Sequence, residues 1–144
     1  MSEQIINFYS ENNDFELEDQ KSFDKWIREV IVSEEKDLGE INYIFCDDHY
    51  LYKINLKFLE HDNYTDIISF DNSEGNELHG DIFISTDRVK ENASEYNVSF
   101  SDELKRVMIH GILHLCGYGD KSESEAKEMR QKEDEKIALF HVEQ

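Results

Sequence analysis

The sequence predicts an α+β fold in which a four-stranded mixed sheet packs with about five helices. Three observations lead to this prediction. Short runs of β-branched and aromatic residues alternate with helical patterns, a polar connection separates two of these runs, and the last third has helical periodicity throughout. With 144 residues and a hydrophobic content of 38%, the chain can bury a core, so we expect residues 1–144 to form a single domain.

The first half of the chain begins with two strands and a helix between them. Residues 5–9 and 41–46 are rich in β-branched and aromatic side chains, which predicts strands. Residues 19–35 predict an amphipathic helix, and we expect Gly39 to end it and Trp26 to anchor the core. The apolar stripe of this helix consists of Phe23, Trp26, Ile27, Val30 and Ile31.

A second helix is predicted directly after residue 46. Asp47 and Asp48 can cap its start, because carboxylates accept hydrogen bonds from the first free N–H groups of a helix. The residues expected to face inward are Leu51, Ile54 and Phe58.

Two further strands complete the predicted sheet. Residues 62–64 form a loop into a strand at 67–70, and residues 71–79 form a polar connection to a strand at 81–85. Because a short connection suits antiparallel strands and a helical crossover suits parallel ones, we expect a mixed sheet.

Three helices are predicted in the last third, over residues 86–96, 101–116 and 122–140. Ser122 and Glu125 have the spacing of a capping box, and we expect the Lys and Glu residues of the last helix on a charged outer face. The buried stripe of the middle helix consists of Leu104, Val107, Met108, Gly111, Ile112 and Leu115.

Two histidines flank that stripe at the edge of the predicted core. His110 and His114 are four residues apart, so a helix places them on one face with about 5–6 Å between Cβ atoms. Gly117 can end the helix in a left-handed conformation and turn the chain so that Asp120 becomes a third ligand. Two histidines, one carboxylate and an open position are typical of catalytic zinc. We therefore predict one divalent ion, most readily zinc, on His110, His114 and Asp120.

The ligands alone leave the substrate open. Three protein ligands lower the pKa of a zinc-bound water to about 7, and the hydroxide so formed attacks carbonyl or phosphorus centres. The spacing H-x-x-x-H-x-x-G-x-x-D matches the zincin-like metal helix of metzincin peptidases. However, Gly111 stands where H-E-x-x-H peptidases have their general base. A zinc peptidase is therefore the second hypothesis.

Three motifs resemble the YbeY family of ribosomal RNA maturation factors. They are H-G-x-L-H-L-x-G-Y from His110, T-D-[VI]-[LI]-S-F over residues 65–70 and G-D-I-x-I-S over residues 80–85. They occur in the family's order, and the likeness covers nearly the whole chain. The resemblance implies a metal-dependent hydrolase, an endoribonuclease that cleaves single-stranded RNA. It also implies maturation of the 3′ end of small-subunit ribosomal RNA and ribosome quality control.

The chain departs from the family pattern at three positions. Asp120 stands in place of the usual third histidine, Gly119 in place of an aspartate, and Leu59 in place of an arginine. The first change keeps a ligand but replaces nitrogen by oxygen, which makes the site harder and looser for zinc. The change at Leu59 removes a group that could bind substrate or phosphate.

The sequence offers few candidates for the remaining chemistry, and beyond the metal-bound water it assigns no catalytic residue. Asp66 and Asp81 start strands, where each can act as general base or orient a ligand histidine, or only form strand-end hydrogen bonds. The basic residues nearest to the motif along the chain, which could stabilise charge on a substrate, are Arg88, Lys105 and Arg106. They could equally belong to the solvated surface of their helices.

Composition restricts the partners. The 34 acidic and 15 basic residues give a formal charge of −19, which argues against non-specific binding to nucleic acid or to an anionic membrane. An acidic protein can reach RNA through basic ribosomal proteins, so a ribosome assembly factor with a structural metal is the third hypothesis. We expect ribosomal RNA, the small ribosomal subunit and its proteins as partners, no membrane contact, and a monomer.

The cysteines and the N-terminus indicate the compartment. Cys46 and Cys116 are too few for a disulfide framework, no basic-then-apolar leader begins the chain, and no apolar run reaches the about 18 residues of a membrane span. We therefore expect a cytoplasmic protein and interpret Cys116 as a small buried residue. The histidines interpreted as structural or exposed are His49, His61, His79 and His141.

Overall fold

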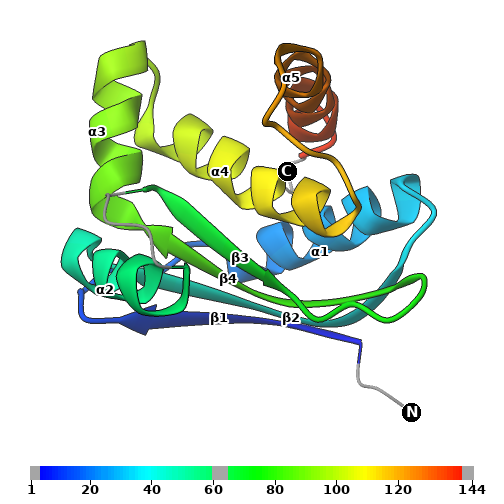
Figure 1. The fold of residues 1–144 in the computed structure, drawn as a ribbon, viewed down its shortest axis with the longest axis horizontal. Helices are drawn as coiled ribbons and strands as arrows, with labels where there is room; N and C mark the ends of the chain where they lie inside the picture. The colour runs from blue at the N-terminus through cyan, green and yellow to red at the C-terminus, as the bar shows by residue number, and fades with distance from the viewer. Residues whose placement is uncertain (1–3, 60–64, 141–144) are drawn as a thin grey trace.

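The computed structural model describes residues 4–59 and 65–140 and has the predicted α+β architecture (Figure 1). The expected loop at 62–64 lies outside the described residues. The elements, in chain order, are β1 (Ile5–Glu11), α1 (Gln20–Ser33), β2 (Asp37–Cys46), α2 (Asp48–Leu59), β3 (Ile67–Asp71), β4 (Glu77–Ser85), α3 (Thr86–Tyr96), α4 (Phe100–Leu115) and α5 (Glu123–Ile137).

The sheet has the strand order β1-β2-β4-β3 and is mixed, as predicted. β1 and β4 each pair with β2 in parallel, whereas β3 pairs with β4 in the antiparallel direction. The connection between β3 and β4 is shorter than expected, because β4 begins at Glu77 and the chain turns at Gly75 with φ +57°. A left-handed backbone at this turn suits glycine.

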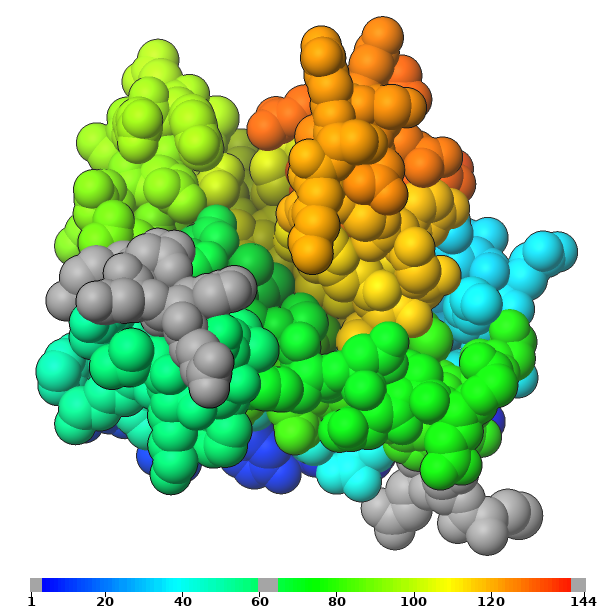
Figure 2. Space-filling view, in the orientation of Figure 1, coloured from blue at the N-terminus to red at the C-terminus, as the bar shows by residue number. Residues whose placement is uncertain are grey.

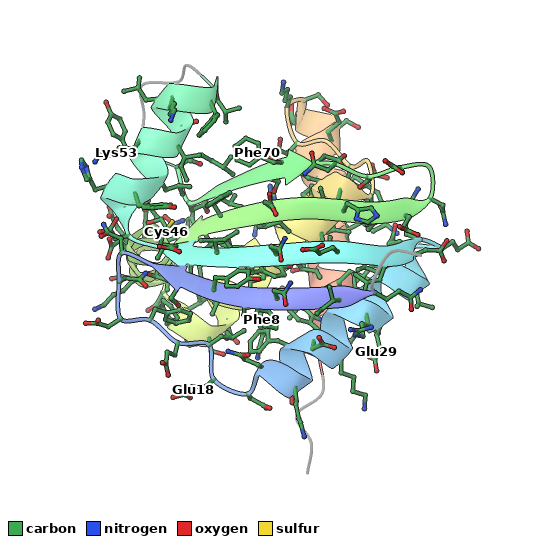
Figure 3. All side chains as sticks on the ribbon, turned by 90° about the horizontal axis from the view of Figure 1, so that it is seen from below. Phe8, Glu18, Glu29, Cys46, Lys53 and Phe70 are labelled. Carbon is green, nitrogen blue, oxygen red and sulfur yellow. The ribbon has the colours of Figure 1, made fainter. Side chains whose placement is uncertain are left out.

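The helices cover the two faces of the sheet unequally. α1 and α4 lie on one face, and α3 and α5 stand at either side of α4 (Figure 1). Seen from below, most of the other face is open, with α2 at one edge (Figure 3). The side chains of the covered face form the main core, in which Trp26 is 1% exposed as predicted.

Hydrogen bonds tie the helices to this core. The Tyr43 hydroxyl donates to the carbonyl oxygen of Met108 at 2.9 Å, which fixes α4 against β2. The Trp26 Nε1–H donates to the carbonyl oxygen of Lys136 at 2.7 Å, which fixes α5 against α1. Both partners are buried, where an unmade hydrogen bond would cost about 1–3 kcal/mol. The elements that carry the candidate site are therefore rigidly positioned.

Two local predictions in the first half are wrong. Gly39 does not end a helix: α1 ends at Ser33, and Gly39 lies buried in β2, where an added Cβ would sit 2.3 Å from the His79 ring. The missing side chain thus makes room for that ring. On α2, Phe58 is 59% exposed, whereas Asn55 is buried together with Leu51. α2 packs at the sheet edge, so its buried face is narrower than the apolar spacing indicated.

The helices of the last third follow the prediction closely. The predicted stripe of α4 is buried in full. At α5, the Ser122 hydroxyl accepts from the Glu125 N–H, and the Glu125 carboxylate accepts from the Ser122 N–H, which completes the capping box. None of the helices in the described ranges is long and apolar enough to cross a membrane.

Candidate metal centre

The two histidines of the motif lie on the last two turns of α4. His110 and His114 are partly buried, and their rings meet edge to face with centroids 4.4 Å apart. The helix periodicity places them beside the buried stripe, at the border between core and solvent. The predicted position at the edge of the core is confirmed.

Asp120 reaches the same point from the segment after α4. The chain leaves the helix at Gly117, whose φ of +108° is in the region that favours glycine. The Asp120 Oδ2 atom then lies 3.2 Å from His110 Nε2 and 3.4 Å from His114 Nε2. One potential ligand atom from each residue falls within 4.8 Å of the others. The fold therefore brings the predicted triad together.

The other ring nitrogen of each histidine has its own partner. His110 Nδ1 lies 2.6 Å from Glu133 Oε2, and His114 Nδ1 lies 2.9 Å from the carbonyl oxygen of Tyr118. Because both partners accept hydrogen bonds, each ring carries its proton on Nδ1 and presents Nε2 to Asp120. A carboxylate or carbonyl behind the ring is what orients histidine ligands of metals. The donor set thus fits a divalent metal such as zinc.

Glu133 was missed by the sequence analysis, which placed the charged residues of this helix on an outer face. Its side chain is 6% exposed, and its second oxygen accepts a hydrogen bond from Arg106 Nη1 at 2.7 Å. Lys136 is also buried. Met129, Glu133 and Lys136 follow the i, i+4, i+7 spacing of a buried stripe, and this spacing could have identified Glu133.

A buried ion cluster supports the segment that holds His114. The Tyr118 hydroxyl donates to Glu34 Oε1 at 2.7 Å, and Lys136 Nζ lies 2.7 Å from Glu34 Oε2. Burial acts to raise the pKa of Glu34, but the hydrogen bonds from Lys136, Tyr118 and Lys132 outweigh it and leave this pKa lowered. Tyr118 is therefore anchored to α1 and α5 while its carbonyl group orients His114.

The triad lies in a cleft of about 1230 Å³. Figure 2 shows the molecule hollowed between α3 and α5, with α4 behind. Asp66 lines the cleft and accepts a hydrogen bond from Asn92 Nδ2 at 3.3 Å. Burial raises the pKa of Asp66, while the nearby His110 opposes this effect. A carboxylate with a raised pKa in a cleft is a candidate proton acceptor.

Comparison with known proteins agrees with this geometry. The family profile described as Endoribonuclease YbeY matches residues 6–141. The chain belongs to the YbeY family. Proteins named Endoribonuclease YbeY from Flavobacterium johnsoniae and Christiangramia forsetii are 62% and 63% identical over 140 and 139 residues. These matches cover 97% and 96% of this chain, and 100% and 96% of the relatives.

A solved structure supports the family fold. The solution structure of a Thermotoga maritima protein superposes with a TM-score of 0.67 at 28% sequence identity. The match covers 94% of this chain and 89% of that one. The four-stranded mixed sheet with its helices is thus shared with a solved protein.

Asp81, the second carboxylate that the sequence offered as a partner of the triad, lies elsewhere. It is on β4, and its Oδ1 atom accepts from Asn42 Nδ2 at 3.0 Å within a row of polar side chains on the open face of the sheet. Neighbouring strand residues alternate between faces, so Asp81 points away from the covered face, on which Ile82 is buried in the core. Of the two roles that the sequence left open for Asp81, the structure is consistent with the hydrogen-bonding role on the strand.

The basic candidates also fall in different places. Arg88 binds the Asp48 carboxylate, and Lys105 lies over the Phe140 ring, so neither lines the cleft. Arg106 does line it but is held by Glu133 and Asp134.

The sequence analysis missed two exposed cations that line the cleft near the triad. They are Lys121 and Arg130. Leu59, at the position of the family's arginine, lines the same cleft. Lys121 and Arg130 are therefore available to bind a substrate in a cleft that lacks an arginine at position 59.

The remaining cysteine and histidine interpretations are consistent with the structure where it describes them. Burial raises the pKa of Cys116 to about 11, which makes this thiol a poor nucleophile at neutral pH. His49 is exposed. Both ring nitrogens of His79 are engaged, Nε2 with Glu77 at 2.6 Å and Nδ1 with the Glu40 N–H at 3.2 Å. His61 and His141 lie outside the described residues.

Proposed function

We propose that this protein is a zinc-dependent endoribonuclease that cleaves single-stranded RNA. Its task would be maturation of the 3′ end of small-subunit ribosomal RNA and ribosome quality control. The observation that carries the proposal is the convergence of His110 Nε2, His114 Nε2 and Asp120 Oδ2 in one cleft. Membership of a family whose relatives are named Endoribonuclease YbeY supports RNA as the substrate.

His110, His114 and Asp120 would hold one zinc ion. When bound, such an ion polarises a phosphoryl oxygen and lowers the pKa of a coordinated water. The protein's own part is to fix the ligands, and Glu133 and the Tyr118 carbonyl group do so from behind the two imidazole rings. Catalysis needs such a preorganised site, because loosely held groups lose the benefit of orientation.

Two further groups would act on the RNA itself. Asp66 lines the cleft on the side of β3 and is positioned to accept a proton from the attacking hydroxyl group or water. Lys121 and Arg130 line the cleft and would bind the phosphates of the strand. In this way Lys121 and Arg130 would take over the phosphate contact for which Leu59 has no charged group.

The packing around Gly111 argues against a zinc peptidase. A Cβ at this position would lie 3.0 Å from one Ile82 methyl group and 3.1 Å from Ile67 Cδ1. A glutamate therefore cannot be accommodated here without moving β3 or β4 side chains. The general base of H-E-x-x-H peptidases has no place in this fold.

The strongly acidic composition favours RNA that is presented on the ribosome. A formal charge of −19 repels free polyanions, whereas basic ribosomal proteins would attract this surface and bring the RNA within reach. We therefore place the protein in the cytoplasm, as a monomer on the small subunit.

The test compares two histidine variants, His114→Ala and the matched control His79→Ala on the open face. We expect about one zinc per wild-type chain, loss of zinc and of single-stranded RNA cleavage in His114→Ala, and retention of both in His79→Ala. Zinc is measured by elemental analysis and cleavage with labelled oligonucleotides and small-subunit precursor RNA. Zinc bound without any cleavage would favour the assembly factor, and absence of zinc would exclude the metal centre.

A further inference from the structure

The end of the cleft away from the triad contains an aromatic group that the proposed reaction does not use. Tyr96, the last residue of α3, lines the cleft and is 60% exposed. Val98, which follows it in the turn to α4, also lines the cleft and is 44% exposed. An exposed aromatic ring in a concave site offers a platform on which an unpaired base can stack.

Glu103 lines the same cleft and is unusual for a carboxylate. It is in the first turn of α4, it lines the cleft, and it is only 5% exposed. Within the described ranges no hydrogen-bond donor or cation contacts its carboxyl group. Its neighbour Asp102 is exposed, and the Asp102 N–H already completes the helix cap with Ser99. Glu103 is therefore not needed for capping.

The carboxyl oxygens of Glu103 reach the cleft, since among the described residues Ser69 Oγ is the only fully enclosed side-chain polar atom without a hydrogen-bond partner. Burial raises the pKa of Glu103 and the charge of Asp66 raises it further, while the charges of Arg106 and Arg130 act in the opposite direction. A ligand that donates hydrogen bonds would take the place of water at this carboxylate. Tyr96 and Glu103 both line the cleft that such a ligand would enter.

Distance along α4 indicates which part of the RNA this would be. Glu103 and His110 are seven residues apart on one face of the helix, a rise of about 10 Å. A strand whose phosphate reacts at the triad would therefore place a neighbouring nucleotide, and not the reacting phosphate, beside Glu103.

We propose that Tyr96 and Glu103 form a nucleobase subsite, in which Tyr96 stacks on the base and Glu103 accepts hydrogen bonds from guanine. Guanine is the one RNA base with two adjacent donors, N1–H and N2–H, on its Watson–Crick edge, and these match the two oxygens of a carboxylate. The proposal rests on the proposed function for its substrate class, single-stranded RNA. It adds a preference for guanine next to the cleaved bond.

The experiment measures binding separately from cleavage. Zinc-loaded protein is titrated with fluorescein-labelled 2′-O-methyl hexamers of uridine that carry one guanine or one adenine, and anisotropy gives Kd. The variants are Tyr96→Ala, Tyr96→Phe and Glu103→Gln, with Tyr9→Ala as the control for an exposed tyrosine on the open face, 49% exposed. Zinc content and thermal unfolding show that each variant is folded.

The expected pattern is specific. Tyr96→Ala weakens guanine-hexamer binding by about 5- to 150-fold, the range for loss of one stacked base. Tyr96→Phe changes the Kd of the guanine hexamer less than about twofold, since an aromatic ring is kept. Tyr9→Ala also changes this Kd less than about twofold, since the whole subsite is kept. Glu103→Gln removes the guanine preference and leaves adenine-hexamer binding unchanged.

Equal affinity of the wild type for the two hexamers, or wild-type binding by Tyr96→Ala, would overturn the subsite. A cleavage assay on the same proteins keeps the two proposals distinct. Guanine preference without cleavage would support the subsite and contradict the nuclease. Cleavage that is unchanged in the Tyr96 and Glu103 variants, without a guanine preference, would support the nuclease and contradict the subsite.

Discussion

The two faces of the sheet carry the same kinds of polar side chain in different arrangements. On the open face His79 uses both ring nitrogens, one with Glu77 and the other with the Glu40 N–H. On the covered side His110 and His114 use only Nδ1 for orientation, and each keeps Nε2 directed at Asp120. Histidines near carboxylates are thus insufficient for a metal site. What matters is which nitrogen is left and where it points.

The largest contrast should separate Asp66 from Asp81. Asp66→Asn should lower the rate of RNA cleavage by about 100-fold or more, because a general base contributes 10²–10⁴. Asp81→Asn should stay within about twofold, since its amide can keep the hydrogen bond with Asn42 on the open face. Single-turnover rates of both proteins, at equal zinc content, measure this. Comparable losses in the two variants would contradict the assignment of the site to one face.

A second contrast concerns stability. Glu34→Gln should lower the free energy of unfolding by about 3 kcal/mol, because it removes the negative charge nearest to the buried ammonium group of Lys136. Glu40→Gln on the open face should change it little, since Glu40 is exposed and accepts only a 3.2 Å bond from Asn42. Urea unfolding measures both.

The effect of Glu34 also has a defined pH dependence. The folded-state pKa of Glu34 lies below its ordinary value of 4.5, so its contribution is present above that pH and is lost as the pH falls through the folded pKa. The difference in stability between wild type and Glu34→Gln should therefore shrink on acidification below 4.5. A difference that grew in acid would show that Glu34 is not held as an anion by Lys136.

The third contrast tests orientation at the metal. Glu133→Gln should weaken zinc binding about 10- to 100-fold, the usual cost of losing the carboxylate behind a ligand histidine. Glu77→Gln, which alters the carboxylate beside His79, should leave zinc affinity unchanged. Competition with a chromogenic chelator gives both constants. Unchanged affinity in Glu133→Gln would mean that His110 is oriented by the helix alone.

The parts of this site that the sequence predicts are those governed by local spacing. His110 and His114 share a face because they are four residues apart, and Asp120 follows because Gly117 turns the chain. Glu133 is different, since its contact with His110 spans 23 residues and depends on how α5 crosses α4. The spacing of the buried residues on α5 is visible in the sequence, but the histidine that Glu133 contacts is not.

The same distinction holds for the fold. The α4 stripe and the α5 capping box follow from periodicity and short-range hydrogen bonds, and both were predicted. Gly39 and Phe58 were misplaced because their surroundings come from other elements, the His79 ring in one case and the limited coverage by the sheet edge in the other. The role of Asp81 stayed open in the sequence, because the face to which a strand residue points depends on the register and on which face is covered.

The smallest expected effect concerns the ligand in which this chain departs from its family. Asp120→His should tighten zinc binding by about tenfold, because imidazole suits zinc better than a carboxylate and avoids a charged ligand that is 40% exposed to water. The gain is limited because the longer side chain must fit where Asp120 Oδ2 now lies 3.2 and 3.4 Å from the two Nε2 atoms. Competition titration of Asp120→His and wild type measures the zinc affinity. The control is His79→Asp, which makes the opposite exchange of histidine for aspartate on the open face. Equal or weaker affinity in Asp120→His would show that Asp120 is a hydrogen-bond partner of the two histidines and not a ligand.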